Sequence, residues 1–279
     1  MASHAAGLAA HRDAILRRAD KAGTRRHTTA GEPRMANSQY FSLLNHYVAL
    51  PGYRPQAVFS PVTADLNRDG HQDLLVFGAS YPWGAYTQPT PQAGAVLFGD
   101  GRGGFVAAPE STFPTASLLT VHPRKIVVED FNGDGRPDVF VASHGWDTHP
   151  FPGEQNRLYL SQGETWVDAT ARLPVLQDFT HTAAAGDIDG DGDVDLFVGN
   201  GYAGQNHILS YLLVNDGTGH FAVDRGAIPA TSGSVLDFDT AHHFPGATLA
   251  DLDGDRLPDL IVTADASASY DTLRESVVL

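Results

Sequence analysis

Cysteine is absent from this sequence, which excludes disulfide bonds and thiol chemistry. Long apolar runs are also missing, since no stretch of 18 residues is apolar enough for a transmembrane helix. Positive charge is scarce: 18 Lys and Arg stand against 33 Asp and Glu, and the formal net charge is −15. A chain this acidic, without a basic stripe, is a poor ligand for nucleic acid. We therefore expect no nucleic-acid partner and no membrane span.

Glycine and apolar residues are plentiful. The chain has 279 residues, of which 29 are glycine and 42% are hydrophobic. This length and composition suffice for a sizeable core, and the glycine content favours many short strands joined by tight turns.

The most informative stretch is an aspartate-rich loop at residues 187–195. Asp187, Asp189, Asp191 and Asp195 occupy positions 1, 3, 5 and 9 of this loop. Alternate positions of a tight loop turn inward and can supply carboxylate oxygens, and position 7 (Asp193) can add its backbone carbonyl. Ca²⁺ accepts six to eight oxygen ligands, whereas Mg²⁺ prefers to keep several waters. The pattern therefore predicts a calcium site, with a glycine at position 6 to permit the sharp reversal.

The same pattern occurs three more times, which predicts about four Ca²⁺ sites. The fourth copy has Arg256 where the others have glycine, so a non-glycine residue has to adopt a positive φ there at some cost. We therefore expect the weakest metal site in that copy. The candidate ligands of the other three copies, with position 7 again contributing a backbone carbonyl, are Asp65, Asn67, Asp69, His71 and Asp73; Asp130, Asn132, Asp134, Arg136 and Asp138; and Asp251, Asp253, Asp255, Leu257 and Asp259.

These loops are not EF-hands. An EF-hand loop ends with a bidentate glutamate at position 12 and continues into a helix. Here position 12 is a valine in all four copies, and each loop is followed by a short apolar run of the kind found in buried strands. The predicted strand segments are 74–77, 139–141, 196–198 and 260–262.

The four loops define a repeat. Their first aspartates are 65, 57 and 64 residues apart, a period that indicates a propeller or an array of small sheets. Each unit is predicted to run from loop to strand, exposed loop, strand, glycine-rich hairpin turn, strand and connection. The units lie near residues 60–120, 121–180, 181–245 and 246–279, and the last is incomplete. We therefore expect a fragment of a longer propeller, or an open arc that can self-associate through unpaired strand edges.

The loop segments ADLNRDGHQDLLVFG, EDFNGDGRPDVFVAS, GDIDGDGDVDLFVGN and ADLDGDRLPDLIVTA resemble the FG-GAP/VCBS repeats of integrin-like calcium-binding β-propellers. The resemblance implies an all-β fold, here a partial propeller of about 3.5 to 4 four-stranded blades. It also implies an extracellular or cell-surface protein that serves as a non-enzymatic recognition or adhesion module for a protein or glycan. The alternative is a polysaccharide lyase or hydrolase built on the same calcium-stabilised scaffold.

Residues 1–35 differ in composition from the repeat region at 36–279. They carry seven of the 18 basic residues and lack the continuous apolar core of a secretory signal. We expect a disordered extension or a short helix, with a targeting or docking helix as the alternative.

The exposed loops after the predicted calcium strands carry aromatic residues at a recurring place. Tyr81, Trp146 and Tyr202 lie 16, 16 and 15 residues after the first loop aspartate of their units, and Trp83 and His144 lie beside them. These side chains could stack on sugar rings, or they could pack between neighbouring sheets. Both interpretations stay open from the sequence.

Histidine is abundant, with 13 residues in the chain. His144 and His149 flank Trp146 and Asp147, and His242 and His243 follow Asp237 and Asp239. A zinc site or an acid–base site could be assembled from either group, although loop histidines are usually only solvated. The enzymatic alternative needs Asp147, Glu154 and His144 to converge in one pocket, which a sequence does not show.

Overall fold

The computed structural model describes residues 57–79, 90–201, 206, 208–225, 242–266 and 276–278. All of them fall within the unit that spans Val48–Leu279. The basic extension at 1–35 lies outside the described residues, as do Tyr81, Trp83 and Tyr202.

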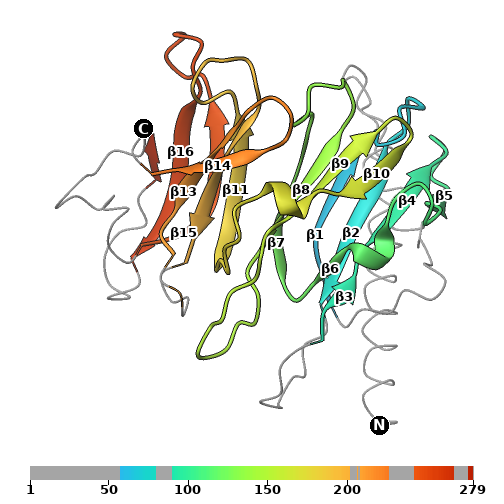
Figure 1. The fold of residues 1–279 in the computed structure, drawn as a ribbon, viewed down its shortest axis with the longest axis horizontal. Coiled ribbons are helices and arrows are strands. Elements are labelled where there is room, and N and C mark those ends of the chain that lie inside the picture. The colour runs from blue at the N-terminus through green and yellow to red at the C-terminus, as the bar shows by residue number, and fades with distance from the viewer. Residues whose placement is uncertain are drawn as a thin grey trace, which may run out of the picture. The chain divides into compact units, whose positions relative to one another are not determined.

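The fold is all-β, as predicted, and consists of consecutive antiparallel sheets (Figure 1). Within each sheet the strands pair in chain order. Two short 3₁₀ turns, at Thr115–Ser117 and Thr170–Arg172, and a separate pair of two-residue strands, β3 (Gln92–Ala93) and β6 (Leu119–Thr120), complete the described elements. The sheet strands are β1 (Ala57–Ala64), β2 (Asp73–Ala79), β4 (Ala95–Gly99) and β5 (Phe105–Ala107); β7 (Pro123–Glu129), β8 (Asp138–Ser143), β9 (Arg157–Gln162) and β10 (Thr165–Asp168); β11 (Thr180–Gly186), β12 (Asp195–Asn200), β13 (Tyr211–Asn215) and β14 (Phe221–Asp224); and β15 (His242–Ala250), β16 (Asp259–Ala266) and β17 (Ser276–Val278).

Each aspartate-rich loop joins the first strand of a sheet to the second. The register is the same in all four sheets, because the residue before loop position 1 pairs with the aspartate at position 9. These pairs are Ala64 with Asp73, Glu129 with Asp138, Gly186 with Asp195, and Ala250 with Asp259. The predicted apolar segments form the second strands. The first strands lie in the segments that were predicted only as connections between units.

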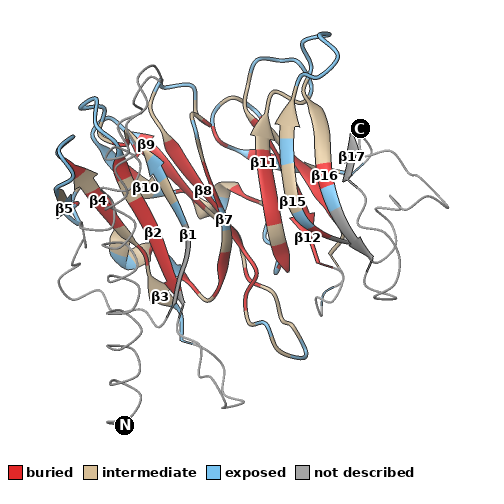
Figure 2. Ribbon diagram, turned by 180° about the vertical axis from the view of Figure 1, so that it is seen from behind, coloured by how far each residue is buried: buried red, intermediate tan, exposed pale blue. Residues whose placement is uncertain are grey.

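The core lies between the sheets, because alternate side chains of one strand point to opposite neighbours. In β8, Val139 and Val141 pack with residues of the first sheet, whereas Phe140 and Ala142 pack with residues of the third. Phe197 of β12 belongs to a separate cluster with Phe244 and Val262 of the fourth sheet. Figure 2 shows the resulting buried bands along the middle strands. Each interior sheet is thus covered on both faces.

The first strands of successive sheets are neighbours. Strand β7 contacts both β1 and β11, and β11 in turn contacts β15. Ala183, Ala184 and Ala185 of β11 supply small side chains at this approach. Each first strand also contains an irregularity in its pairing with the second strand, and in β11 the extra residue is His181. Such bulges re-aim a side chain, and they are frequent beside functional sites.

Candidate metal centres

The aspartate at position 9 ties each loop to its sheet. Asp73, Asp138 and Asp195 are fully buried. Their Oδ2 atoms accept hydrogen bonds of 2.8–2.9 Å from the backbone N–H of loop position 2. Their Oδ1 atoms accept a second backbone N–H from the third-strand region of the sheet, at Gly99 (2.9 Å), Ser161 (2.6 Å) and Asn215 (2.8 Å). In the fourth loop, Asp259 Oδ2 likewise accepts from Leu252 at 2.8 Å.

Burial raises the pKa values of these three carboxyl groups. Desolvation raises the pKa of Asp138 to about 6, against the opposing effect of its hydrogen bonds from Ser161 and Phe131. The pKa of Asp73 and of Asp195 is raised for the same reason. A cation beside such carboxylates would favour their ionised form.

The remaining loop carboxylates fold back onto the loop itself. The aspartate at position 1 accepts the N–H of position 6 in every copy, at 2.7–3.1 Å. The side chain at position 3 accepts the N–H of position 5, and position 5 accepts that of position 7. These contacts gather oxygen atoms on one side of the turn. One ligand atom each from Asp187, Asp189 and Asp195 lies within 4.8 Å of the others, and so does one from each of Asp251, Asp253 and Asp255.

The backbone of the loops is left-handed at two positions. Position 6 has a φ of 86°, 77°, 96° and 78° in the four copies, so the predicted positive φ at Arg256 is confirmed. Position 4 is also left-handed, with a φ of 62° at Arg68 and glycine in the other three copies. The left-handed conformation of position 4 was not predicted from the sequence, although glycine in three of the four copies was a usable signal.

Position 7 takes part in the loop through its backbone N–H. His71, Arg136, Asp193 and Leu257 each donate a backbone N–H to position 5. Their carbonyl oxygens as calcium ligands stay a prediction. The loop oxygens that are assembled nevertheless form the kind of hard, anionic donor set that suits Ca²⁺.

A second group of candidate ligands lies at the opposite ends of the strands. His144 directly follows β8, whose other end begins at Asp138 of a calcium-type loop. Its side chain is 1% exposed, and its Nε2 atom lies 3.1 Å from Nε2 of His181 and 3.9 Å from Oδ1 of Asp147. One ligand atom from each of His122, His144 and Asp147 lies within 4.8 Å of the other two.

The pKa values of two of these histidines are lowered. Burial, reinforced by His181 and His122, holds the pKa of His144 far below its ordinary value. Burial, with a contribution from Arg124, lowers the pKa of His122 to about 4. Both imidazoles are therefore neutral at physiological pH and can offer a nitrogen lone pair.

The histidine cluster in the structure differs from the group that the sequence suggested around Trp146. Asp147 and His144 are in it, but the exposed His149 does not contribute a ligand to it. Glu154 is buried, and its carboxylate accepts backbone N–H groups of Val121 and His122 at 3.0–3.4 Å. It therefore positions backbone rather than facing solvent. His122 and His181 were missed because strand pairing within the second sheet brings His122 to His144, and the packing of two sheets brings His181 to it.

The other predicted candidates are less informative. Trp146 is half-buried in the loop after β8. Of the second histidine group, Asp237 and Asp239 lie outside the described residues, and His242 and His243 are described only as backbone in β15.

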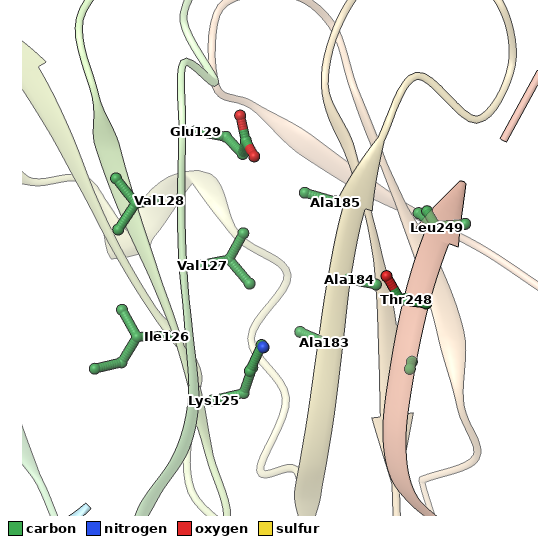
Figure 3. A pocket seen from close by; sticks show the side chains of 11 residues that line it. Lys125, Ile126, Val127, Val128, Glu129, Ala183, Ala184, Ala185, Thr248 and Leu249 are labelled. Atoms are coloured by element: carbon green, nitrogen blue, oxygen red, sulfur yellow. The ribbon is translucent and has the colours of Figure 1, made fainter. Parts of the chain in front are cut away.

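A shallow hollow of about 230 Å³ lies among the first strands β7, β11 and β15 (Figure 3). Lys125, Val127 and Glu129 point from β7 toward the alanines of β11, whereas Ile126 and Val128 point away. Thr248 and Leu249 complete the lining from β15. The walls are mostly small and aliphatic, so this hollow offers few groups for catalysis.

Comparison with known proteins identifies the repeat. A family model described as FG-GAP-like repeat matches residues 130–198 and 187–262. Each match runs from the first aspartate of one loop to the valine at position 12 of the next. Residues 130–262 thus match FG-GAP-like repeats over two overlapping spans.

One solved structure to which the chain is similar is that of an Agrocybe aegerita lectin, described as recognising non-reducing terminal N-acetylglucosamine specifically. The identity is 18% and the TM-score 0.44, and the match covers 77% of this chain and 50% of that one. The chain thus spans half the length of that lectin. No curated protein sequence matches the chain. Within the described part of the chain, no helix has the length and apolarity that a membrane crossing requires.

Proposed function

We propose that the chain is a calcium-stabilised repeat scaffold whose sheets are successive blades of a partial β-propeller. The observation that carries this proposal is the recurrence of one loop geometry in four sheets: the same register, the same left-handed positions and the same inward hydrogen bonds. Contacts between neighbouring first strands support the blade arrangement, because first strands line the axis of a propeller.

The residues present fit calcium. In each loop positions 1, 3, 5 and 9 would hold the ion through side-chain oxygens, and the ion would supply positive charge rather than reactivity. Position 9 would act twice, since its carboxylate already binds two backbone N–H groups in the first three loops. The loops would therefore transmit calcium binding directly to the pairing of the second and third strands.

For biological role we propose non-enzymatic recognition of a protein or glycan at the cell exterior. The exposed loops after the second strands are the proposed contact surface, and Trp146 is its described aromatic residue. Glycan-array binding by Trp146→Ala, measured beside its melting temperature, tests this role. Lost binding at unchanged stability supports a sugar site, whereas lost stability with intact binding assigns Trp146 to packing.

Calcium titration by calorimetry on EDTA-stripped full-length protein tests the scaffold. We expect about four sites and a clear rise in melting temperature when calcium is added. Asp187→Asn should remove one site and leave the others titrating, because each loop is built from its own residues. Exposed Glu164→Gln is a charge-matched control and should leave the stoichiometry unchanged. Absence of calcium binding by the folded protein would refute the proposal.

A further inference from the structure

We propose that His122, His144, His181 and Asp147 form a binding site for a divalent transition-metal ion, with Zn²⁺ the best match. This inference goes beyond the calcium scaffold and does not depend on it, because the residues and the donor chemistry are different. Imidazole nitrogens suit Zn²⁺, Cu²⁺ and Ni²⁺, whereas the loop carboxylates suit Ca²⁺.

The tautomers of two histidines point to a cation between them. Nδ1 of His181 lies 3.1 Å from the carbonyl oxygen of Phe179, and Nδ1 of His144 lies 3.3 Å from that of Gly145. A carbonyl oxygen can only accept, so each Nδ1 carries the ring proton. Both Nε2 atoms then present lone pairs to each other at 3.1 Å. Two acceptors at that distance repel unless a metal ion or a shared proton lies between them.

Two donor distances at His144 are compatible with a shared ion. Zinc–nitrogen bonds of 2.0–2.1 Å place two ligands of a tetrahedron about 3.4 Å apart. The Nε2 atoms of His144 and His181 are 3.1 Å apart, and Asp147 Oδ1 lies 3.9 Å from His144 Nε2. The carboxylate is half exposed, so it can close onto an ion without disturbing the core.

A strand bulge and several backbone hydrogen bonds bring these residues together. His181 is the extra residue at the bulge of β11, and His144 N–H donates to the carbonyl of His122 at 2.9 Å. The loop that carries Asp147 is fixed by paired backbone bonds between Glu154 and Asp178, at 2.7 and 3.0 Å.

Two left-handed glycines allow this loop to lie close to its neighbours. A Cβ at Gly145 would come within 2.4 Å of the carbonyl oxygen of Gly153, and a Cβ at Gly153 would come within 2.4 Å of that of Gln177. The site thus rests on rigid surroundings rather than on a free loop.

The histidines are held by hydrogen bonds and by aromatic packing, as the ligands of a metal centre commonly are. The backbone carbonyls of Phe179 and Gly145 accept hydrogen bonds from Nδ1 of His181 and His144 and so orient these imidazoles, as the partners of metal-bound histidines commonly do. Phe179 stacks on His144 with ring centroids 3.7 Å apart, and Phe151 packs on Phe179 at 5.4 Å. Three histidines and one carboxylate would fill a tetrahedron, which is typical of structural zinc. The ion would join the second sheet, through His122 and His144, to the third, through His181.

Zinc titration of the full-length, EDTA-stripped protein in excess calcium tests the site, because excess calcium competes with zinc for the carboxylate loops. We expect one tight zinc equivalent for the wild type. His181→Asn and Asp147→Asn should each weaken it roughly tenfold or more. The matched control is His149→Asn, an exposed histidine two residues after Asp147 that is not in the cluster, and it should bind zinc like the wild type. Co²⁺ in place of zinc should give the visible absorption of a tetrahedral nitrogen–oxygen site.

The outcomes separate the possibilities. Lack of a zinc equivalent in the folded wild type would overturn the proposal and assign a shared proton to the two histidines. Undiminished binding by both His181→Asn and Asp147→Asn would place the metal at other histidines and overturn it as well. Because Asp147 is exposed, its variant remains decisive even where His181→Asn fails to fold. Thermal melts of each variant with and without calcium accompany the titrations. The presence of a melting transition shows that the variant folds, and its shift with calcium shows whether calcium stabilises the scaffold.

Discussion

The side-chain amide of Asn215 donates a 2.7 Å hydrogen bond to the backbone carbonyl of Phe131, 84 residues earlier in the chain. Phe131 is position 2 of the second loop, and the backbone N–H of Asn215 binds Asp195 at position 9 of the third loop. One residue therefore connects two candidate calcium loops in different sheets.

Asn215→Ala should lower the free energy of unfolding by roughly 2–3 kcal/mol, because it leaves buried backbone groups without their partner. The backbone N–H bond to Asp195 is retained, but the side-chain amide also donates to the carbonyl of Val194 in the third loop at 3.1 Å. Because the substitution removes this contact as well as the one to Phe131, it should also weaken calcium binding at two loops rather than one. Urea unfolding and calcium titration measure the two effects. Thr218→Ala on the same hairpin removes an exposed hydroxyl and should change stability by less than about 0.5 kcal/mol. Equal effects of the two substitutions would contradict the coupling.

Arg256→Gly should stabilise the fourth loop. Arg256 has a φ of 78°, a conformation that costs an L-residue roughly 1–2 kcal/mol. After the greater freedom of glycine in the unfolded chain is subtracted, we expect a gain of up to about 1 kcal/mol and tighter calcium binding there.

The reciprocal change is Gly135→Ala, at the same position of the second loop. No atom lies within 4 Å of a Cβ built on Gly135, so its substitution introduces backbone strain without a clash. A loss of about 1 kcal/mol is expected. Thermal melts in calcium check both variants, and shifts of the same sign would show that backbone strain is not the cause.

Asp138→Asn should destabilise the protein even in EDTA. Its carboxylate accepts backbone N–H groups of Phe131 and Ser161, and an amide can accept only one of them. We expect a loss of roughly 2–3 kcal/mol. Asp130→Asn, at position 1 of the same loop, should cost less in EDTA but should weaken calcium binding. If Asp130→Asn were the more damaging change in EDTA, position 9 would have no special role in joining the loop to the sheet.

Asp178 should make stability depend on pH. Burial raises its pKa to about 6 from an ordinary value of 3.8, although hydrogen bonds from Tyr211 and Asn200 oppose the shift. Because the folded state holds the proton more tightly, this contribution is complete below pH 4 and is lost as pH rises through about 6. The loss is on the order of 3 kcal/mol.

Urea unfolding of the wild type and Asp178→Asn across this range, at constant calcium, measures the effect. As pH rises, the free energy of unfolding of the wild type should fall relative to that of Asp178→Asn. Exposed Glu164→Gln should follow the wild type. A constant difference would show that Asp178 does not titrate in this window.

The calcium-type loops and second strands were predictable because each carries its own local signal. Aspartate or asparagine recurs at loop positions 1, 3, 5 and 9, and a short apolar run follows each loop. Even the strain at Arg256 followed from one missing glycine. The glycine-rich hairpin turn expected in each unit was equally visible, and in the first three sheets Gly101, Gly163 and Gly217 adopt a positive φ between the third and fourth strands.

The first strands and the histidine cluster were not predictable in this way. Strand β11 reads THTAAAG, in which two threonines are the only β-branched residues and valine, isoleucine, phenylalanine and tyrosine are missing. Its place beside β7 and β15 favours small side chains. His122 and His181 lie 22 residues before and 37 residues after His144. Only the pairing of strands and the stacking of sheets bring the three rings together, and neither leaves a motif in the sequence.

The shared register of the four loops has a consequence for how the chain can vary. Since the residue before position 1 faces position 9 in every sheet, each loop begins and ends at equivalent points of an antiparallel pair. A loop of one sheet can therefore replace that of another without shifting any strand by a residue. The chain is, in this sense, a set of interchangeable cassettes, in which ion affinity can be tuned blade by blade while the framework stays the same.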